Sequence, residues 1–144
     1  MVNIIKNNDK TVLIVDDDPA ICDMMTTVLT RENIQVVSTV HSKEALSYLK
    51  SGSYLKIDLV VTDLQMPEYG GFSIIRDLQS ASYENVPVLV VTGRNLDDQA
   101  ISMIGLESNV KGVFRKPLQI KTFVAKIHEV LGTVSPNLPP EDLL

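Results

Sequence analysis

Five short runs rich in β-branched residues alternate along this chain with segments of helical periodicity, and this alternation constrains the fold more than any other feature. Runs such as LVVT and VLVVT are apolar at consecutive positions, which is typical of strands covered on both faces in a parallel sheet. Repeated βα units with right-handed connections predict an α/β protein with a doubly wound, five-stranded parallel sheet. The predicted strands are 11–15, 34–39, 57–62, 86–91 and 110–115, and the predicted helices are 19–31, 42–51, 71–80, 97–107 and 118–131.

Signals at helix ends support these boundaries. Asp18 followed by Pro19 is the pattern of a helix cap with proline in the first turn, which explains Asp18 better than a role as a ligand. Asp97 and Asp98 open a later helix, where negative charge favours the positive end of the helix dipole. That helix has the weakest pattern of the five, because Gly105 interrupts it.

The length of 144 residues suits one domain with a sizeable core. We predict an N-terminal lead at 1–10, the domain at 11–132 and a Pro-rich tail or linker at 133–144. The last segment, TVSPNLPPEDLL, holds three prolines, which indicates a linker or a frayed end.

Charge and composition exclude several classes of protein. The formal net charge is −5 and the chain has no cluster of Lys and Arg, so direct nucleic-acid binding is not expected. The apolar runs are far shorter than the ~20 residues needed to cross a bilayer, so no membrane partner is expected. Cys22 is the single cysteine, which excludes an internal disulfide and fits a reducing cytoplasm. Its place beside core positions of the first helix predicts an inert thiol.

Charged and hydroxyl side chains stand at the carboxyl ends of the predicted strands. The set consists of Asp16 and Asp17 after the first strand, Asp63 after the third, Thr92 at the end of the fourth and Lys116 after the fifth. In open α/β sheets these ends meet at one rim, where ligands bind. Two carboxylates ~4 Å apart repel by ~4 kcal/mol at an effective dielectric of 20, so the rim needs a counter-charge. Lys116 and a Mg²⁺ ion could supply it, and both could neutralise a phosphoryl group, for which Asp is a known acceptor.

Four motifs in this order, VLIVDDDP, VVTDLQMPEYGG, VLVVTG and FRKP, resemble the signature of the receiver domain of response regulators in two-component signalling. The resemblance spans roughly residues 11 to 131. It implies a flavodoxin-like sheet of order 2-1-3-4-5 with five helices on both faces.

The resemblance also implies a metal site. Asp16 and Asp17 correspond to the acidic pair of the family, and Asp17 and Asp63 would be side-chain ligands of Mg²⁺, with Mn²⁺ as an alternative. The backbone carbonyl of Gln65 would be the third protein ligand.

The same resemblance assigns the phosphoryl chemistry. Asp63 would be the phosphoacceptor, Thr92 would donate its hydroxyl to a phosphoryl oxygen, and Lys116 would pair with the phosphoryl group. The peptide bond before Pro117 would be cis.

One position departs from the family pattern. The family usually carries Tyr or Phe three residues before the lysine of the fifth strand, and this chain has Val113 there. Phe114 is adjacent, but strand alternation directs it to the opposite face of the sheet. The chemistry should survive this change, whereas the usual movement of the aromatic ring is not expected.

The resemblance implies partners as well. A histidine kinase or a histidine phosphotransfer protein would supply the phosphoryl group, in the cytoplasm. The output partner or output domain is not readable from these residues. A homodimer through the face of the fourth helix, fifth strand and fifth helix is one expectation for the family.

Two other functions compete with this interpretation. A haloacid dehalogenase-type phosphatase would use an acidic pair after the first strand with a later Thr and Lys, which Asp16 to Asp18, Thr92 and Lys116 resemble. It leaves Asp63 without a role, and no suitable acidic pair follows Lys116. A phosphorylation-independent pseudo-receiver is the other alternative; Val113 favours it, and the intact acidic set opposes it.

The remaining candidate residues have simpler explanations. His41 and His128 are lone histidines without metal-ligand spacing, and we predict a solvated loop and a helix surface for them. Met24, Met25 and Met103 are predicted to fill gaps in the core rather than to form a groove for a partner.

Overall fold

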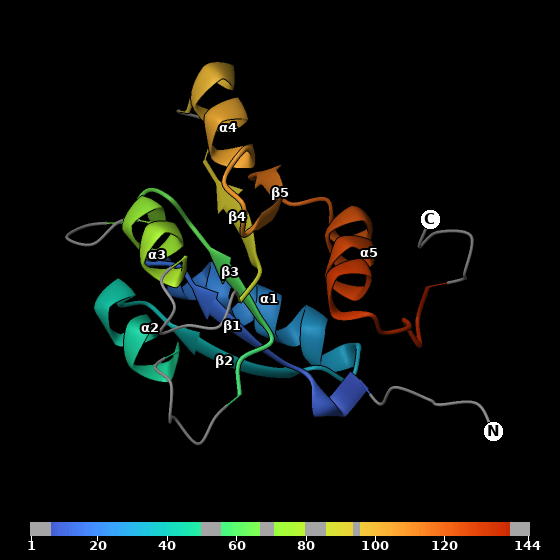
Figure 1. The fold of residues 1–144 in the computed structure, drawn as a ribbon. Coiled ribbons are helices and arrows are strands. Elements are labelled where there is room, and N and C mark those ends of the chain that lie inside the picture. The colour runs from blue at the N-terminus through green and yellow to red at the C-terminus, as the bar shows by residue number, and fades with distance from the viewer. Residues whose placement is uncertain (1–6, 50–55, 67–70, 80–85, 94–95, 139–144) are drawn as a thin grey trace.

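The computed structural model describes residues 7–49, 56–66, 71–79, 86–93 and 96–138, which form five parallel strands and five α-helices (Figure 1). A short 3-10 helix, η1 (Asn7–Asp9), precedes the first strand. The strands are β1 (Thr11–Val15), β2 (Gln35–Thr39), β3 (Leu59–Thr62), β4 (Val88–Thr92) and β5 (Val110–Arg115). The helices are α1 (Pro19–Arg31), α2 (Ser42–Leu49), α3 (Gly71–Leu78), α4 (Asp98–Gly105) and α5 (Ile120–Leu131).

The sheet has the order β2-β1-β3-β4-β5 with every neighbouring pair parallel, which confirms the predicted doubly wound fold. Helices α1 and α5 pack on one face, and α2, α3 and α4 pack on the other (Figure 1). The strand order reverses between β1 and β3. The carboxyl ends of these two strands are therefore the place where sheets of this type bind ligands.

The central strands are buried on both faces, which explains their consecutive apolar residues. Leu13 of β1 joins the core beneath α2 and α3, whereas Ile14 joins the core beneath α1 and α5. All five residues of β4 are buried in the same way. Each such side chain stabilises the fold by about 1.5–3 kcal/mol when it is buried. A strand with apolar residues only at alternate positions would bury apolar side chains on one face alone and would lose about half of the strand's total contribution.

Most element boundaries agree with the prediction, and the differences have local causes. Helix α1 and strand β5 have the predicted bounds. Strand β4 begins at Val88 rather than at residue 86, because Pro87 has no N–H to donate and only accepts a bond from Val60 N (3.0 Å). Asp97 caps α4 by accepting a bond from Ala100 N (2.7 Å), so the helix starts one residue later than predicted. The predicted helix residues 50, 51 and 80 lie outside the described residues.

The segment after α5 is packed against the domain, contrary to the expectation of a frayed end. Gly132 ends α5 in the left-handed region (φ 71°), and the chain then turns back toward the C-terminal end of α1. There the carboxylate of Glu32 accepts hydrogen bonds from Ser135 Oγ and from Asn137 Nδ2 (2.5 Å). The expectation of a frayed end is therefore wrong for residues 133–138. Residues 139–144 lie outside the described residues, and a division of the chain at residue 132 stays a prediction.

His128 is also part of this packing, and its predicted place on a helix surface is wrong. Its side chain is 1% exposed, with Nε2 2.8 Å from Glu32 Oε1 and Nδ1 2.7 Å from Thr133 Oγ1. His41 is exposed, as predicted. We refer below to the Glu32 cluster, which consists of Glu32, His128, Thr133, Ser135 and Asn137.

The methionine prediction is confirmed in part. Met25 is buried in the core and Met24 packs against it, but Met103 is 64% exposed on α4. None of the helices in the described part of the chain has the length and apolar character needed to span a bilayer.

Candidate functional site

The residues singled out at the strand ends lie together at one rim of the sheet, and main-chain hydrogen bonds hold them there. Asp63 N donates to Val15 O (3.0 Å) and Lys116 N donates to Thr92 O (2.7 Å). Asp16 N donates to Thr39 O (3.2 Å). The pairing of the sheet thus continues one residue beyond strands β1, β3 and β5, which places these side chains on a rigid support.

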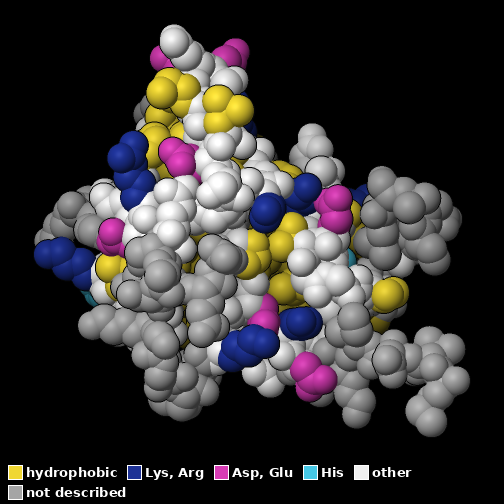
Figure 2. All heavy atoms as spheres, in the orientation of Figure 1, with side chains coloured by type: hydrophobic (Ala, Val, Ile, Leu, Met, Phe, Trp, Pro, Cys, Tyr) yellow, Lys and Arg dark blue, Asp and Glu magenta, His cyan; other side chains and the backbone are white. Residues whose placement is uncertain are grey.

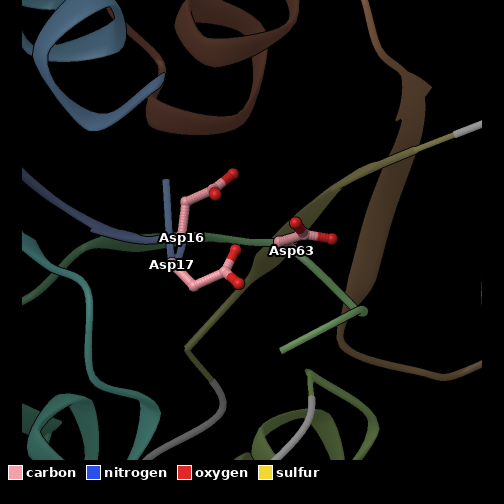
Figure 3. A group of neighbouring side chains, drawn as sticks. All are labelled: Asp16, Asp17 and Asp63. Atoms are coloured by element: carbon pink, nitrogen blue, oxygen red, sulfur yellow. The ribbon is translucent and has the colours of Figure 1, made fainter. Parts of the chain in front are cut away.

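Three carboxylates meet at this rim (Figure 3). One oxygen from each of Asp16, Asp17 and Asp63 lies within 4.8 Å of the others. Asp16 and Asp63 are buried, at 0% and 5% exposed, whereas Asp17 is exposed. Carboxylate oxygens gathered at this distance, with one of them open to solvent, suit a hard divalent cation such as Mg²⁺.

Among the described residues, Lys116 is the cation that contacts these carboxylates. Its Nζ donates a hydrogen bond to Asp63 Oδ2 (2.9 Å) and lies 2.9 Å from Asp16 Oδ2, the latter contact being an ion pair without hydrogen-bond alignment. Burial lowers the pKa of Lys116, but its contacts with Asp16 and Asp63 outweigh burial and raise the pKa above its ordinary value. The ammonium group therefore stays charged at neutral pH.

One lysine does not balance three carboxylates. Burial raises the pKa of Asp16 above its ordinary value of 3.8, although Lys116 and the backbone amide of Asp18 act in the opposite direction. Burial therefore makes the ionised form of Asp16 less favourable, and a further cation next to it would stabilise that form.

Backbone amides fix the remaining oxygens of the two buried carboxylates. Gln65 N donates to Asp63 Oδ1 and Asp18 N donates to Asp16 Oδ1, each at 3.0 Å. Asp18 itself accepts a bond from Ala20 N (3.0 Å), so it caps α1 as predicted. Whether the carbonyl of Gln65 serves as a metal ligand stays a prediction.

Thr92 provides an independent indication that the site receives a polar ligand. The residue is fully buried, and its Oγ1 has no hydrogen-bond partner in the part of the chain that the structure describes. A buried hydroxyl without a partner costs about 1–3 kcal/mol, so it is kept where a ligand supplies the missing bond. The donor set and this hydroxyl together fit a Mg²⁺ ion with a phosphoryl group.

The rim opens into a cleft of about 550 Å³, lined by Asp17, Asp18, Pro19, Asp63, Gln65, Gly93 and Lys116. Gly93 was not singled out from the sequence. A Cβ atom at this position would lie 3.0 Å from Gln65 Oε1, so a larger residue would displace that side chain from the cleft. The glycine directly after the strand in VLVVTG is the signal that could have identified this close approach.

The other sequence predictions near the site are confirmed. The Lys116–Pro117 peptide bond is cis. Val113 packs toward the core that contains Ile104 of α4, and Phe114 faces the other side, edge-on to Phe123 with 5.7 Å between ring centroids.

Cys22 is buried behind the site, where its Sγ donates to Asp16 O (3.3 Å). Burial raises the pKa of Cys22 from 9.0 to about 11, which agrees with an inert thiol.

Comparison with known proteins agrees with this geometry. The profile of the Response regulator receiver domain matches residues 12–128. The DNA-binding response regulator MtrA of Mycolicibacterium smegmatis is 32% identical over 116 residues, which are 81% of this chain and 48% of the relative. The regulatory protein VirG of Agrobacterium tumefaciens is 30% identical over 129 residues, 90% of this chain and 46% of the relative. The chain thus spans about half the length of these curated relatives.

The solved structures give the same result. A response regulator receiver protein from Burkholderia phymatum superimposes with a TM-score of 0.75 at 27% identity, covering 88% of this chain and 98% of that one. A receiver protein from Pseudomonas putida gives 0.73 at 26% identity, covering 83% and 96%. Fold, strand-end residues and family match coincide, and the chain belongs to the response regulator receiver domain family.

Proposed function

We propose that this receiver domain accepts a phosphoryl group on Asp63 from the phosphohistidine of a partner, either a histidine kinase or a histidine phosphotransfer protein. The observation that supports this most is the position of the Asp63 carboxylate. It borders the open cleft, 2.9 Å from Lys116 Nζ and within reach of the Asp16 and Asp17 oxygens.

The transfer exchanges one phosphorus bond for another. An oxygen of Asp63 attacks the phosphorus, the bond between phosphorus and the imidazole nitrogen breaks, and the imidazole leaves with the electron pair. The product is an aspartyl phosphate. Water later attacks the phosphorus, which releases inorganic phosphate and restores the carboxylate. The domain in this scheme is a signalling phosphoacceptor that supports its own modification and its reversal.

The residues of the site contribute positioning and charge. Gln65 N fixes one oxygen of Asp63 and leaves the carboxylate oriented toward the cleft. Lys116 donates to a phosphoryl oxygen while Asp16 keeps its ammonium group in place. The unpartnered hydroxyl of Thr92 donates to another phosphoryl oxygen.

The metal site completes the arrangement. Asp17, Asp63 and the Gln65 carbonyl would hold Mg²⁺, or Mn²⁺ in its place, with Asp16 as the neighbouring carboxylate. A bound ion supplies positive charge against the phosphoryl oxygens.

The output of the signal is a separate part of the proposal. The name of MtrA assigns DNA binding to that relative, and this chain covers 48% of its length. With a net charge of −5, these residues themselves are not proposed to contact DNA. We propose that they act in the cytoplasm by changing a protein-interaction surface that includes α4, β5 and α5, a face that could also form a homodimer.

The proposal is tested by incubation with acetyl phosphate and Mg²⁺ followed by intact-mass spectrometry. The native protein should gain about 80 Da, the mass of one phosphoryl group, and Asp63→Asn should gain nothing. Asp23→Asn is the matched control, because Asp23 is an exposed carboxylate on α1 outside the cleft, and it should be modified like the native protein. An unmodified native protein, or a modified Asp63→Asn, would contradict the proposal.

Two further assays separate the alternatives. Mg²⁺-dependent binding of beryllofluoride is expected here and not for a pseudo-receiver. Sustained turnover of p-nitrophenyl phosphate would instead favour the haloacid dehalogenase-type phosphatase, in which Asp63 has no assigned role.

A further inference from the structure

An arginine next to the site is not used by the chemistry described above. Arg115 is the last residue of β5, directly before Lys116, and it pairs in register with Thr92 of β4. Its guanidinium group is bound at the start of α4, and Arg115 does not line the cleft. Nη1 donates to Leu96 O (3.0 Å) and Nη2 donates to Asp98 Oδ1 (2.6 Å).

These contacts hold one end of a short connection whose other end lies in the site. Thr92 ends β4, and α4 begins only six positions later at Asp98. At the near end Lys116 N donates to Thr92 O; at the far end the Arg115 side chain holds Leu96 and Asp98. Arg115 at the end of β5 and the next residue, Lys116, therefore hold the two ends of the connection.

Helix α4 contributes little to the core. Ile104 is its one residue buried in the core, while Met103 and Leu106 at its end are 64% and 85% exposed. Figure 1 shows α4 standing at the edge of the molecule beside β4 and β5, and Figure 2 shows hydrophobic side chains on its surface. Val113 of β5 supplies only apolar contact on this side. The Arg115 fork, that is, the two hydrogen bonds from its guanidinium group to Leu96 O and Asp98 Oδ1, thus holds the first turn of α4 together with the Asp97 cap.

We propose that Arg115 is a positioning residue that couples the state of the Asp63 site to α4, an inference that rests on the proposed phosphoryl transfer. In the unmodified domain the fork is closed and holds the first turn of α4. When the Thr92 hydroxyl bonds to the phosphoryl group, the connection shifts, the fork opens, and α4 with its exposed apolar side chains is released to a partner.

Amide hydrogen exchange by mass spectrometry tests this coupling in the full chain, with and without beryllofluoride and Mg²⁺. One peptide covers α4 and a second covers β3 and Asp63, which reports occupation of the site. In the unmodified domain, Arg115→Ala should raise exchange in α4 by about 1.4- to 5-fold, the range expected for an exposed charged pair. Beryllofluoride should raise α4 exchange in the native chain and add little in Arg115→Ala.

Three more variants separate coupling from a change of electrostatic field. Asp98→Asn changes the charge in the opposite direction to Arg115→Ala, yet should raise α4 exchange as well. The double variant should exceed Arg115→Ala by little, because both changes break the same contact. Lys111→Ala is the matched control, since Lys111 is an exposed base on β5 that also donates to a backbone carbonyl, Ser108 O (3.4 Å). It should leave α4 as in the native chain.

The outcomes are distinguishable. Native-like α4 exchange in Arg115→Ala, or an equal response of both proteins to beryllofluoride, would overturn the role of Arg115. A response in the Asp63 peptide of the native chain without one in α4 would overturn it too and leave the proposed function intact. Amide exchange that beryllofluoride leaves unchanged in both peptides would refute the proposed function, and this inference with it.

Discussion

Thr62 and Thr92 occupy equivalent positions, at the carboxyl ends of adjacent strands, and both are fully buried. Thr62 Oγ1 donates to the carbonyl oxygen of Asp63 (3.0 Å). Thr92 Oγ1 has no such bond to any described residue. A buried threonine hydroxyl thus stabilises the fold at Thr62 and, in the absence of a ligand, destabilises it at Thr92.

We predict opposite effects of replacing these two hydroxyls by a methyl group of similar shape. Thr92→Val should raise the free energy of unfolding by about 1 kcal/mol, because it removes an unpaired buried hydroxyl, and Thr62→Val should lower it by about as much. Urea denaturation followed by circular dichroism measures both. Thr92→Val should also weaken beryllofluoride binding. A loss of stability in Thr92→Val equal to that in Thr62→Val would mean that its hydroxyl already has a partner.

Residues differ in how far the sequence could predict their roles. Asp16, Asp63 and Lys116 each follow a buried strand, and parallel strands bring their ends together, so their meeting could be predicted. His128 could not be placed in the same way, because its partner Glu32 is 96 positions away and lies in no recognisable motif. Arg115 was missed because the sequence shows only that it precedes a lysine.

At the level of elements, the Glu32 cluster joins the ends of α1 and α5 with the segment that follows. Burial raises the pKa of Glu32, but the hydrogen bonds from Asn137, Ser135 and His128 outweigh burial and lower the pKa below its ordinary value of 4.5. The ionised carboxylate is therefore favoured by folding. Since the folded pKa is depressed, this contribution is complete above the unfolded pKa of 4.5 and is lost as the pH falls through the folded pKa.

We expect Glu32→Gln to lower the free energy of unfolding by about 1–3 kcal/mol at pH 7, because the amide cannot accept every bond that the carboxylate accepts. The difference from the native protein should shrink as the pH falls below 4.5. Urea titrations at several pH values measure it. Glu129→Gln is the control, since this exposed α5 residue forms a surface ion pair with Lys126 (3.0 Å) and its replacement should change stability little. A loss independent of pH would contradict the account.

Secondary structure was predictable where local signals exist. The Asp18–Pro19 cap and the glycine after α5 gave helix ends, and Asp97 marked the start of α4. The packing of residues 133–138 was not predictable. The three prolines of 133–144 favour a linker, whereas residues 133–138 are held by a buried carboxylate at the C-terminal end of α1, a long-range contact without a local sequence signal.

At the scale of the whole molecule, repulsion among the carboxylates of the site lowers the stability of the folded state. Three carboxylates meet at the rim, and among the described residues Lys116 pairs with two of them, in a chain whose net charge is already −5. A cation that binds the folded state and not the unfolded chain stabilises the protein by mass action, by about 2.7 kcal/mol at a hundredfold excess over its Kd.

Mg²⁺ should therefore raise the melting temperature in a concentration-dependent way, beyond the effect of NaCl at equal ionic strength. Asp63→Asn should melt higher than the native chain without Mg²⁺, because it removes one repelling charge, and should respond less to the ion. Differential scanning calorimetry measures both without needing tryptophan, which the chain lacks. Identical curves in MgCl₂ and NaCl would argue against a metal site.

The global architecture was the most predictable level. Alternation of strands and helices with both faces buried leaves few topologies, and the five-stranded order agreed with the one implied by resemblance. The coupling of the site to α4 depends on side-chain geometry at the end of β5, which no pattern of strands and helices encodes.

The packing of Ser135 and Asn137 onto Glu32 has a practical consequence for protein engineering. A designer who joins this receiver to a foreign effector would, from the glycine that ends α5, cut at residue 132. Such a cut leaves a buried carboxylate without two of its donors. A fusion junction placed after Leu138 keeps them, and it starts the added polypeptide beside α1 instead of beyond the end of α5.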